Sequence, residues 1–268
     1  MAALSVVWCN GQPAGTDALA AAALVNYGHF TSLRCVDGAV QGLDMHLARL
    51  QAGTRALFGS ELDPARVCHE ARQAWEAAGH RDAWLRLTVF SRDFDFRTPL
   101  RSVTPDLLVS VSPAADGAGV PMRVRPVVFR RHRPEIKHVG TFALFDLRRQ
   151  AVAEGWDDAV FVDDAQHLIE GTTWNLCLWD GQGFTWPAGP ALRGTQERLL
   201  QQGLEALGVT QQVRAVALPE LAAFTGAFAC NARGLREIDA VGGQVFGAAA
   251  AGRALLDQAL AACPWQPW

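Results

Sequence analysis

The chain has 268 residues, a formal net charge of -3, 19% charged residues and 50% hydrophobic residues. These values are typical of a globular protein with one large or two modest domains, and they exclude a general attraction to nucleic acid or to a membrane surface. The longest apolar run, ALAAAALV at 18–25, is too short to span a bilayer.

The first part of the chain predicts helices and strands in mixed order. Apolar residues recur at helical spacing in 43–58, at Leu43, Leu47, Leu50 and Leu57. A second helix is expected to begin at Pro64, which suits a first helical turn, and to end at Gly79. The segments 83–92 and 106–112 predict strands, and SPAADGAGVP at 112–121 is the best linker candidate because it is rich in helix and strand breakers.

The second part continues with a strand at 123–129 and a helix at 141–155. Residues 157–187 predict a meander of three strands, broken by DDAQ and DGQG. The expected remainder is a helix at 195–207, the strand-like VRAVAL, the short helical LPELAAF, the strand-like GAFACN, and a last helix at 248–262. Strands and helices do not alternate as βαβ units, so we predict an α+β (mixed) fold of two domains, 1–115 and 120–268, the second carrying Lys137.

Six cysteines lie far apart, at 9, 35, 68, 177, 230 and 263. No CxxC pair or zinc-ligand spacing results, so we expect no metal site and interpret the cysteines as reduced, buried thiols. The N-terminal MAALSVVWCN shows neither a basic stretch nor a small-residue cleavage site, so we expect a cytoplasmic protein.

Lys137 is the only lysine among 24 basic residues. A composition rich in arginine and alanine explains why lysine is scarce, since arginine replaces it as a solvated cation. Arginine stays protonated, however, and cannot serve where a neutral, nucleophilic amine is needed. The surviving lysine is therefore a candidate for amine chemistry, of which a Schiff base with a substrate or with pyridoxal phosphate is the commonest kind.

A pyridoxal enzyme also needs a carboxylate for the pyridine nitrogen, and a helix N-terminus with an arginine for the phosphate. Glu170 follows a strand-like run in EGTTWN, and LRGTQERLL begins a helix at Gly194 and Thr195. Arg49 lies on the first predicted helix, and Arg86 and Arg97 lie on or just beyond a strand. Each requirement thus has a candidate residue.

Several short motifs, in order between 27 and 238, carry a resemblance to a known family. GHFTSLRCVDG (28–38) resembles its G-x-F-E/T-x-x-R…G segment, HLARL (46–50) its H-x-x-R-L, and GWDDAVFVD (155–163) its G-x-D-E/D-A. EGTTWNL (170–176) resembles E-G-S-S-S-N-I/V, LRGTQE (192–197) resembles L-P/N-G-I-T-R, and CNARGLREI (230–238) resembles the last loop. The sequence is similar to the class IV aminotransferases, the fold type IV pyridoxal enzymes.

The resemblance implies the fold type IV architecture, pyridoxal 5'-phosphate as cofactor, a small amino substrate and a homodimer. It implies that Lys137 is the Schiff-base lysine, that Glu170 pairs with the pyridine nitrogen and that Arg49 holds the phosphate. The further cofactor-binding positions that it implies are Thr172, Thr173, Asn175, Gly194, Thr195, Gln196 and Asn231. The substrate-binding positions that it implies are Tyr27, Thr31, Arg86, Arg97 and Ala232.

The sequence departs from the family at two places. Family members often carry asparagine or tyrosine a few residues after the lysine, whereas this chain has Gly140, Thr141 and Phe142. Tyr27 and Asn175 are the candidates to replace that hydrogen-bond donor to the ring hydroxyl, and the sequence does not choose between them. In the turn after Gly194, threonine and glutamine stand where the family has an apolar residue and threonine.

Three functions stay open at this point. Transamination comes first, because aminotransferases dominate the family. Elimination, as in 4-amino-4-deoxychorismate lyase, is the alternative, since Thr31 stands where aminotransferases usually have glutamate. A ligand-binding protein of the same fold that no longer uses pyridoxal phosphate is the third.

The basic run RVRPVVFRRHRPEIK (123–137) raises the separate question of nucleic-acid binding. No aromatic platform accompanies it, so we interpret it as a solvated strand and loop and expect no nucleic-acid partner.

Overall fold

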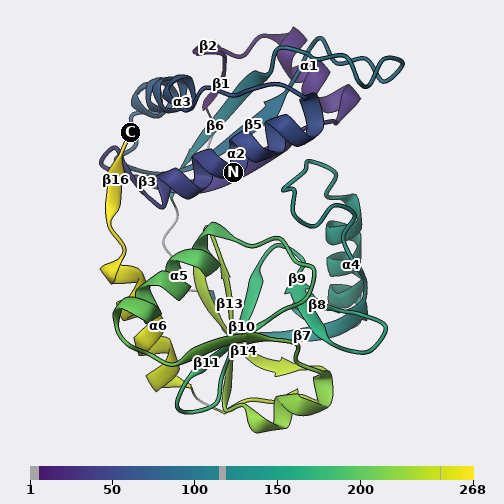
Figure 1. Ribbon diagram of the computed structural model, residues 1–268, viewed down its shortest axis with the longest axis vertical. Helices are drawn as coiled ribbons and strands as arrows, with labels where there is room; N and C mark the ends of the chain where they lie inside the picture. Colours follow the sequence, from purple (N-terminus) through teal and green to yellow (C-terminus); the bar gives the residue numbers. More distant parts are fainter. Residues whose placement is uncertain (1–5, 115–118, 248) are drawn as a thin grey trace. The chain divides into compact units, whose positions relative to one another are not determined.

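The computed structural model describes residues 6–114, 119–247 and 249–268. Its described residues form two compact units, the first made of 6–114, 136–140 and 265–268, and the second of 119–135, 141–247 and 249–264 (Figure 1). Residues 115–118, within the predicted linker, and residue 248, at the start of the last predicted helix, lie outside the described part. Lys137, which the sequence assigns to the C-terminal domain, falls within the first unit.

The first unit is one sheet covered by helices. Its seven strands run β16-β4-β3-β5-β6-β1-β2, and every pairing between them is antiparallel. The strands are β1 (Val6–Cys9), β2 (Gln12–Pro13), β3 (His29–Val36), β4 (Ala39–Gln41), β5 (Asp82–Phe90), β6 (Asp106–Pro113) and β16 (Trp265–Pro267). The helices are α1 (Thr16–Val25), α2 (Leu43–Phe58) and α3 (Pro64–Ala78).

Helices α2 and α3 lie over one face of this sheet, as Figure 1 shows. The predicted apolar stripe of α2 is confirmed, because Leu43 and Leu50 are buried and Leu47 and Leu57 pack against the same core. Helix α3 begins as predicted at Pro64, where the Asp63 side chain accepts a hydrogen bond from the Ala65 N–H, and it ends before a left-handed glycine.

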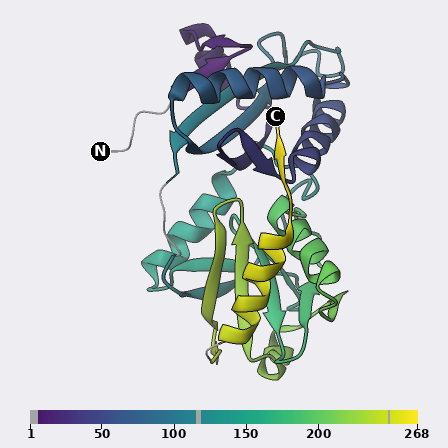
Figure 2. The same ribbon diagram turned by 90° about the vertical axis from the view of Figure 1, so that its left-hand side faces the viewer.

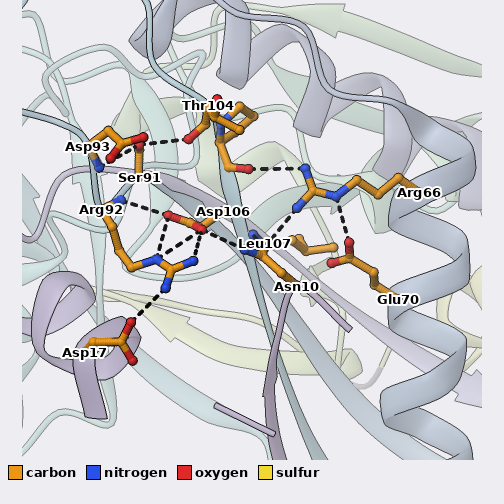
Figure 3. Close-up of polar contacts among 11 residues, drawn as sticks. Asn10, Asp17, Arg66, Glu70, Ser91, Arg92, Asp93, Thr104, Asp106 and Leu107 are labelled. Carbon is orange, nitrogen blue, oxygen red and sulfur yellow. Dashed lines mark hydrogen bonds and ion pairs between the residues drawn. The ribbon is translucent and has the colours of Figure 1, made fainter. Parts of the chain in front are cut away.

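A polar network ties β1, β6 and α3 together (Figure 3). The Asp106 carboxylate accepts hydrogen bonds from Asn10 Nδ2 at 2.7 Å and from Arg92 Nη2 at 2.9 Å. Asn10 in turn accepts from Arg66 Nη2 at 2.9 Å, and Arg66 pairs with the buried Glu70 at 2.7 Å. The network satisfies polar groups in the turn after β1, so the short β1–β2 hairpin is held to the sheet.

The second unit is a nine-stranded mixed sheet with helices α5 and α6 packed together on it (Figure 2). The strand order is β12-β11-β10-β13-β14-β7-β8-β9, with β15 paired to β14. The strands are β7 (Met122–Val128), β8 (Asp158–Val162), β9 (Leu168–Gly171), β10 (Asn175–Trp179), β11 (Phe184–Pro187), β12 (Gln211–Arg214), β13 (Gly226–Asn231), β14 (Gly234–Val241) and β15 (Gln244–Val245). The helices are α4 (Phe142–Ala153), α5 (Thr195–Ala206), a 3₁₀ helix at Leu218–Ala223, and α6 (Ala250–Ala262).

The predicted α+β fold class is confirmed, and one detail of the meander is wrong. Residues 157–187 form four strands where the sequence predicts three, because Thr172–Trp174 make a tight turn that separates β9 from β10. The Gly171 N–H donates to the Trp174 carbonyl at 2.8 Å. A Cβ at Gly171 would lie 2.0 Å from the Trp174 ring, so the turn depends on glycine.

The contact between α2 and β3 encloses a buried histidine. His29 Nε2 lies 3.1 Å from Thr54 Oγ1, and the His29 side chain is so close to α2 that a Cβ on Gly53 would lie 2.6 Å from its Nδ1. His29 is 1% exposed, and burial lowers its pKa from 6.5 to about 4. The folded protein therefore holds His29 neutral at pH values where the unfolded chain protonates it.

We predict a pH dependence of stability from this histidine. A depressed pKa in the folded state means that stability is complete above pH 6.5 and is lost as the pH falls from 6.5 toward 4. The shift corresponds to a loss on the order of 3 kcal/mol. Urea unfolding of His29→Gln between pH 4.5 and 7.5 should show a shallower slope of stability against pH than the unchanged protein. His69→Gln, at an exposed position on α3, is the matched control and should keep the original slope. Equal slopes for the unchanged protein and His29→Gln would contradict the prediction.

Candidate active site

Backbone pairing to β3 positions Lys137. The Phe30 N–H donates to the Lys137 carbonyl at 2.9 Å, and the Val139 N–H donates to the Gly28 carbonyl at 3.0 Å. His29 and His138 are antiparallel bridge partners, so Phe30 lies directly opposite Lys137. Strand β4 pairs with β3 only at its far end, at residues 35 and 36, so the segment 137–139 occupies the same edge beyond it.

The Phe30 ring brings two predicted site residues together. Lys137 Nζ lies 5.0 Å from the centre of this ring, and the Arg86 guanidinium carbon lies 3.6 Å from it. Arg86 reaches the ring from β5, where it pairs with Ser32, two residues along β3 from Phe30. Aromatic rings attract cations, so Phe30 is a favourable contact for both side chains.

Arg49, Thr31 and His46 form a second group, on the helix-covered side of β3. Arg49 Nη1 lies 3.5 Å from Thr31 Oγ1, and Thr31 Oγ1 lies 2.6 Å from His46 Nδ1. Arginine has no acceptor, so the Thr31 oxygen accepts from Arg49, while the direction of its hydrogen bond with His46 follows the tautomer of the imidazole. Burial, with the positive charges of Arg49 and Lys137, lowers the pKa of His46 to about 3, so the ring is neutral.

Tyr27 and Arg97 lie elsewhere in the first unit. The Tyr27 ring stacks on Phe94 at 4.3 Å, and its hydroxyl donates to the Leu57 carbonyl at 3.2 Å. Arg97 is exposed on the segment after β5, where it lies over Phe96 and 3.8 Å from Asp95. Tyr27 and Arg97 thus contact Phe94 and Phe96, whereas Lys137 and Arg86 contact Phe30.

Glu170 is buried at the end of β9 in the second unit. One carboxylate oxygen accepts the Leu192 N–H at 3.2 Å, and the other lies 3.7 Å from Arg131 Nη1. Glu170 is 4% exposed and Arg131 is 8% exposed. The interpretation of the whole basic run as solvated is therefore wrong at Arg131, because its charge is buried beside a buried carboxylate.

Asn175 joins β10 to the turn before α5. Its Nδ2 donates to the Leu192 carbonyl at 2.7 Å, and its Oδ1 accepts the Gly194 N–H at 3.1 Å. A Cβ at Gly194 would lie 2.3 Å from that Oδ1, which explains why glycine stands there. Glu170 and Asn175 thus bond the same short turn, and both the Nδ2 and the Oδ1 of Asn175 form hydrogen bonds with it.

Helix α5 begins directly after this turn and directs the N–H groups of its first turn out of its end. Thr195 is buried and Gln196 is half-buried. The Glu197 side chain returns to the Gly194 N–H at 3.2 Å and pairs with Arg193 at 2.9 Å. Burial raises the pKa of Glu197. The positive end of the helix dipole makes this turn a suitable place for an anion.

The remaining predicted positions differ in accessibility. The Thr172 hydroxyl is buried and donates to Asp158 Oδ1 at 2.7 Å, whereas Thr173 is exposed. Asn231 Nδ2 donates to the Thr173 carbonyl at 3.2 Å, so the loop after β13 lies beside the turn after Glu170. Ala232 is half-buried in that loop.

The structure also shows residues that the sequence did not single out: Phe30, His46, Arg131, Asp158 and Leu192. Phe30, His46, Asp158 and Leu192 lie inside quoted motifs, so their position in the motif is a signal that was available. The contacts that Glu170 makes with Arg131 and Leu192 span 39 and 22 residues of chain, which no local pattern indicates.

Other site types find little support among the residues that the structure describes. No group of three or more histidine, cysteine, aspartate or glutamate side chains there could hold a metal ion. None of the helices in the same residues has the length and apolarity that crossing a membrane requires. All six cysteines are free thiols, five of them buried and Cys68 half-buried.

Comparisons with known proteins identify the family and the fold. The family model for class IV amino-transferases matches residues 28–241. Among curated proteins, none matches the chain. A branched-chain amino acid aminotransferase from T.th. with pyridoxamine 5'-phosphate is similar in structure, with a TM-score of 0.85 and 17% identity over 97% of this chain and 94% of that chain.

Two further solved structures share the fold. A hypothetical aminotransferase from Mycobacterium tuberculosis in a PLP-bound form has a TM-score of 0.77 and 20% identity, over 90% of each chain. A fold IV transaminase from Curtobacterium pusillum has a TM-score of 0.75 and 21% identity, over 91% of this chain and 89% of that chain. At these identities the structures establish the fold, and the family model establishes the family. The chain belongs to the class IV aminotransferase family.

Proposed function

We propose that this protein is a pyridoxal 5'-phosphate-dependent aminotransferase acting on an amino acid or a related small amine, with Lys137 as the catalytic residue. The observation that carries the proposal is the setting of the only lysine in the chain. Lys137 is fixed by backbone pairing to β3, and its amine lies over Phe30 with Arg86 beside the same ring. The family membership and the shared fold of the solved aminotransferases support it.

The residues present are of the types that the cofactor needs. In the first unit Arg49 is a cation of the kind that holds a phosphate, and in the second unit the N-terminus of α5 is of the kind that binds an anion. Glu170 is a buried carboxylate of the kind that keeps a pyridine nitrogen protonated, and Arg131 Nη1 lies 3.7 Å from one of its oxygens. Thr173, Thr195, Gln196 and Asn231 are further proposed contacts of the cofactor.

When bound, the cofactor supplies an aldehyde for covalent attachment and a ring that accepts electrons from the substrate. Lys137 would hold the cofactor covalently, and its amine would be the base that takes the proton from the substrate α-carbon. Arg86 is the better placed of the two candidate arginines to bind a substrate carboxylate, because it shares Phe30 with Lys137. The predicted homodimer and cytoplasmic location are part of the same proposal.

Covalent labelling tests the role of Lys137. The protein incubated with pyridoxal phosphate and then reduced with borohydride should carry one cofactor on the peptide that contains residue 137, located by mass spectrometry. Lys137→Ala and Lys137→Arg should both lose this label, because arginine keeps the charge but lacks a neutral amine. A protein that stays colourless and unlabelled would contradict the proposal and favour a ligand-binding protein of the same fold.

Matched arginine variants test which residue binds the substrate carboxylate. Arg86→Leu should raise KM for an amino acid roughly 10- to 100-fold, the effect of losing a hydrogen bond to a charged group. Arg97→Leu should leave KM within about twofold, since Arg97 lies over Phe96 and near Asp95 and not over the ring that Lys137 contacts. The opposite ranking would place the carboxylate at Arg97.

The reaction itself is tested by its need for an acceptor. A transaminase consumes more than one equivalent of its amino donor per site only when a 2-oxo acid is present to receive the amino group. Elimination is the second candidate, favoured by threonine at position 31, and it would release pyruvate and 4-aminobenzoate from 4-amino-4-deoxychorismate without any acceptor. We expect turnover that depends on the acceptor, measured over a panel of amino donors of both chiralities. A burst of pyruvate in the absence of an acceptor would overturn transamination.

A further inference from the structure

Asp158 is a buried carboxylate that the proposed chemistry does not use. It begins β8 and is 3% exposed. Its Oδ1 accepts the Thr172 hydroxyl at 2.7 Å and the Ala159 N–H at 2.8 Å. Its Oδ2 accepts the Trp174 indole N–H at 3.1 Å and lies 3.7 Å from Arg148 Nε. Every one of these partners presents a hydrogen-bond donor to the carboxylate.

This donor arrangement suits a side chain whose two oxygens both accept hydrogen bonds. Of the four partners, only the Thr172 hydroxyl can also accept a hydrogen bond, because backbone N–H, indole and guanidinium groups only donate. An asparagine at 158 would direct its NH₂ group either at the Ala159 N–H or at Trp174 and Arg148. Either orientation places the NH₂ group against another hydrogen-bond donor in a buried site. Both donors then lack an acceptor, which lowers the stability of the fold.

The 171–174 turn, which Asp158 contacts, lies in the chain between Glu170 and Asn175, the two residues that bond the segment before α5. Thr172 and Trp174 are inside the turn, while Glu170 precedes it and Asn175 follows it. Glu170 accepts the Leu192 N–H, and Asn175 bonds the Leu192 carbonyl and the Gly194 N–H. Hydrogen bonds therefore tie Asp158 to the 171–174 turn, and the residues that flank this turn in the chain bond residues 192–194.

We propose that Asp158 is a positioning residue, which fixes the 171–174 turn and through it the carboxylate of Glu170 and the turn before α5. In this proposal the Thr172 hydroxyl stabilises the turn by donating to Asp158 and is not a cofactor ligand, although the resemblance assigns it to the cofactor. The effect on Glu170 rests on the proposed function, whereas the mechanical coupling from Asp158 to residues 192–194 does not.

Hydrogen exchange of the protein without added cofactor tests the coupling. Asp158→Asn should raise the amide exchange rates of Leu192 and Gly194 at least about tenfold, and leave Leu256 in α6 unchanged. Thr172→Val, which removes one donor only, should give a smaller increase at the same amides, and Thr172→Ser should restore the original rates. Asp157→Asn is the matched control, since the exposed Asp157 carboxylate accepts the Arg123 N–H and no donor of the 171–174 turn. Faster exchange confined to 172–174, or spread over α6 as well, would overturn the proposal.

A pair of ligands tests the consequence for Glu170. Pyridoxal phosphate has the ring nitrogen that Glu170 would hold, and its 1-deaza analogue lacks it. The unchanged protein should bind pyridoxal phosphate more tightly than the analogue. In Asp158→Asn the ratio of the two affinities should fall at least about tenfold. An equal loss for both ligands would show a merely structural role and overturn the positioning of Glu170. If the unchanged protein binds neither ligand, the proposed function fails, while the exchange experiment still decides the coupling.

Discussion

The pairing of residues 137–139 with the edge of β3 is the constraint on which the candidate site depends. Two backbone hydrogen bonds fix the peptide groups on either side of His138, so the Lys137 Cα cannot move independently of the first sheet. A side chain on a free loop would lose rotamer and backbone freedom each time it had to react, whereas this backbone is already ordered by folding. The sheet edge is available because β4 covers only the far end of β3.

The charged side chains of the two units are stabilised by different kinds of neighbour. In the first, Lys137 and Arg86 contact the same aromatic ring, and the neighbouring His46 is kept neutral by a lowered pKa, so it does not add a third positive charge. In the second, the negative charge of Glu170 is buried with Arg131, and that of Asp158 is surrounded by donors. Buried charges are stable only with such partners, which is why these side chains come with specific neighbours rather than singly.

Local patterns were sufficient for most of the secondary structure and for the choice of Lys137. The helices at 43–58 and from Pro64, and the strands from 106 and 226, follow from apolar spacing, capping residues and glycine. Long-range partners were outside the reach of those patterns. The turn that splits β9 from β10 depends on Asp158, and the burial of Arg131 depends on Glu170, so a sequence window around either segment predicts a continuous strand or a solvated cation.

Thr31 shows how geometry changes the meaning of a residue that the sequence had singled out. As a departure from the glutamate of aminotransferases, threonine favours elimination. In the structure it is fully buried, and its hydroxyl oxygen accepts from Arg49 and lies 2.6 Å from His46 Nδ1. A glutamate at the same position would bring a longer, charged side chain into this buried place between Arg49 and His46. Threonine fits the space and bonds both neighbours, so its presence has an explanation that does not require elimination.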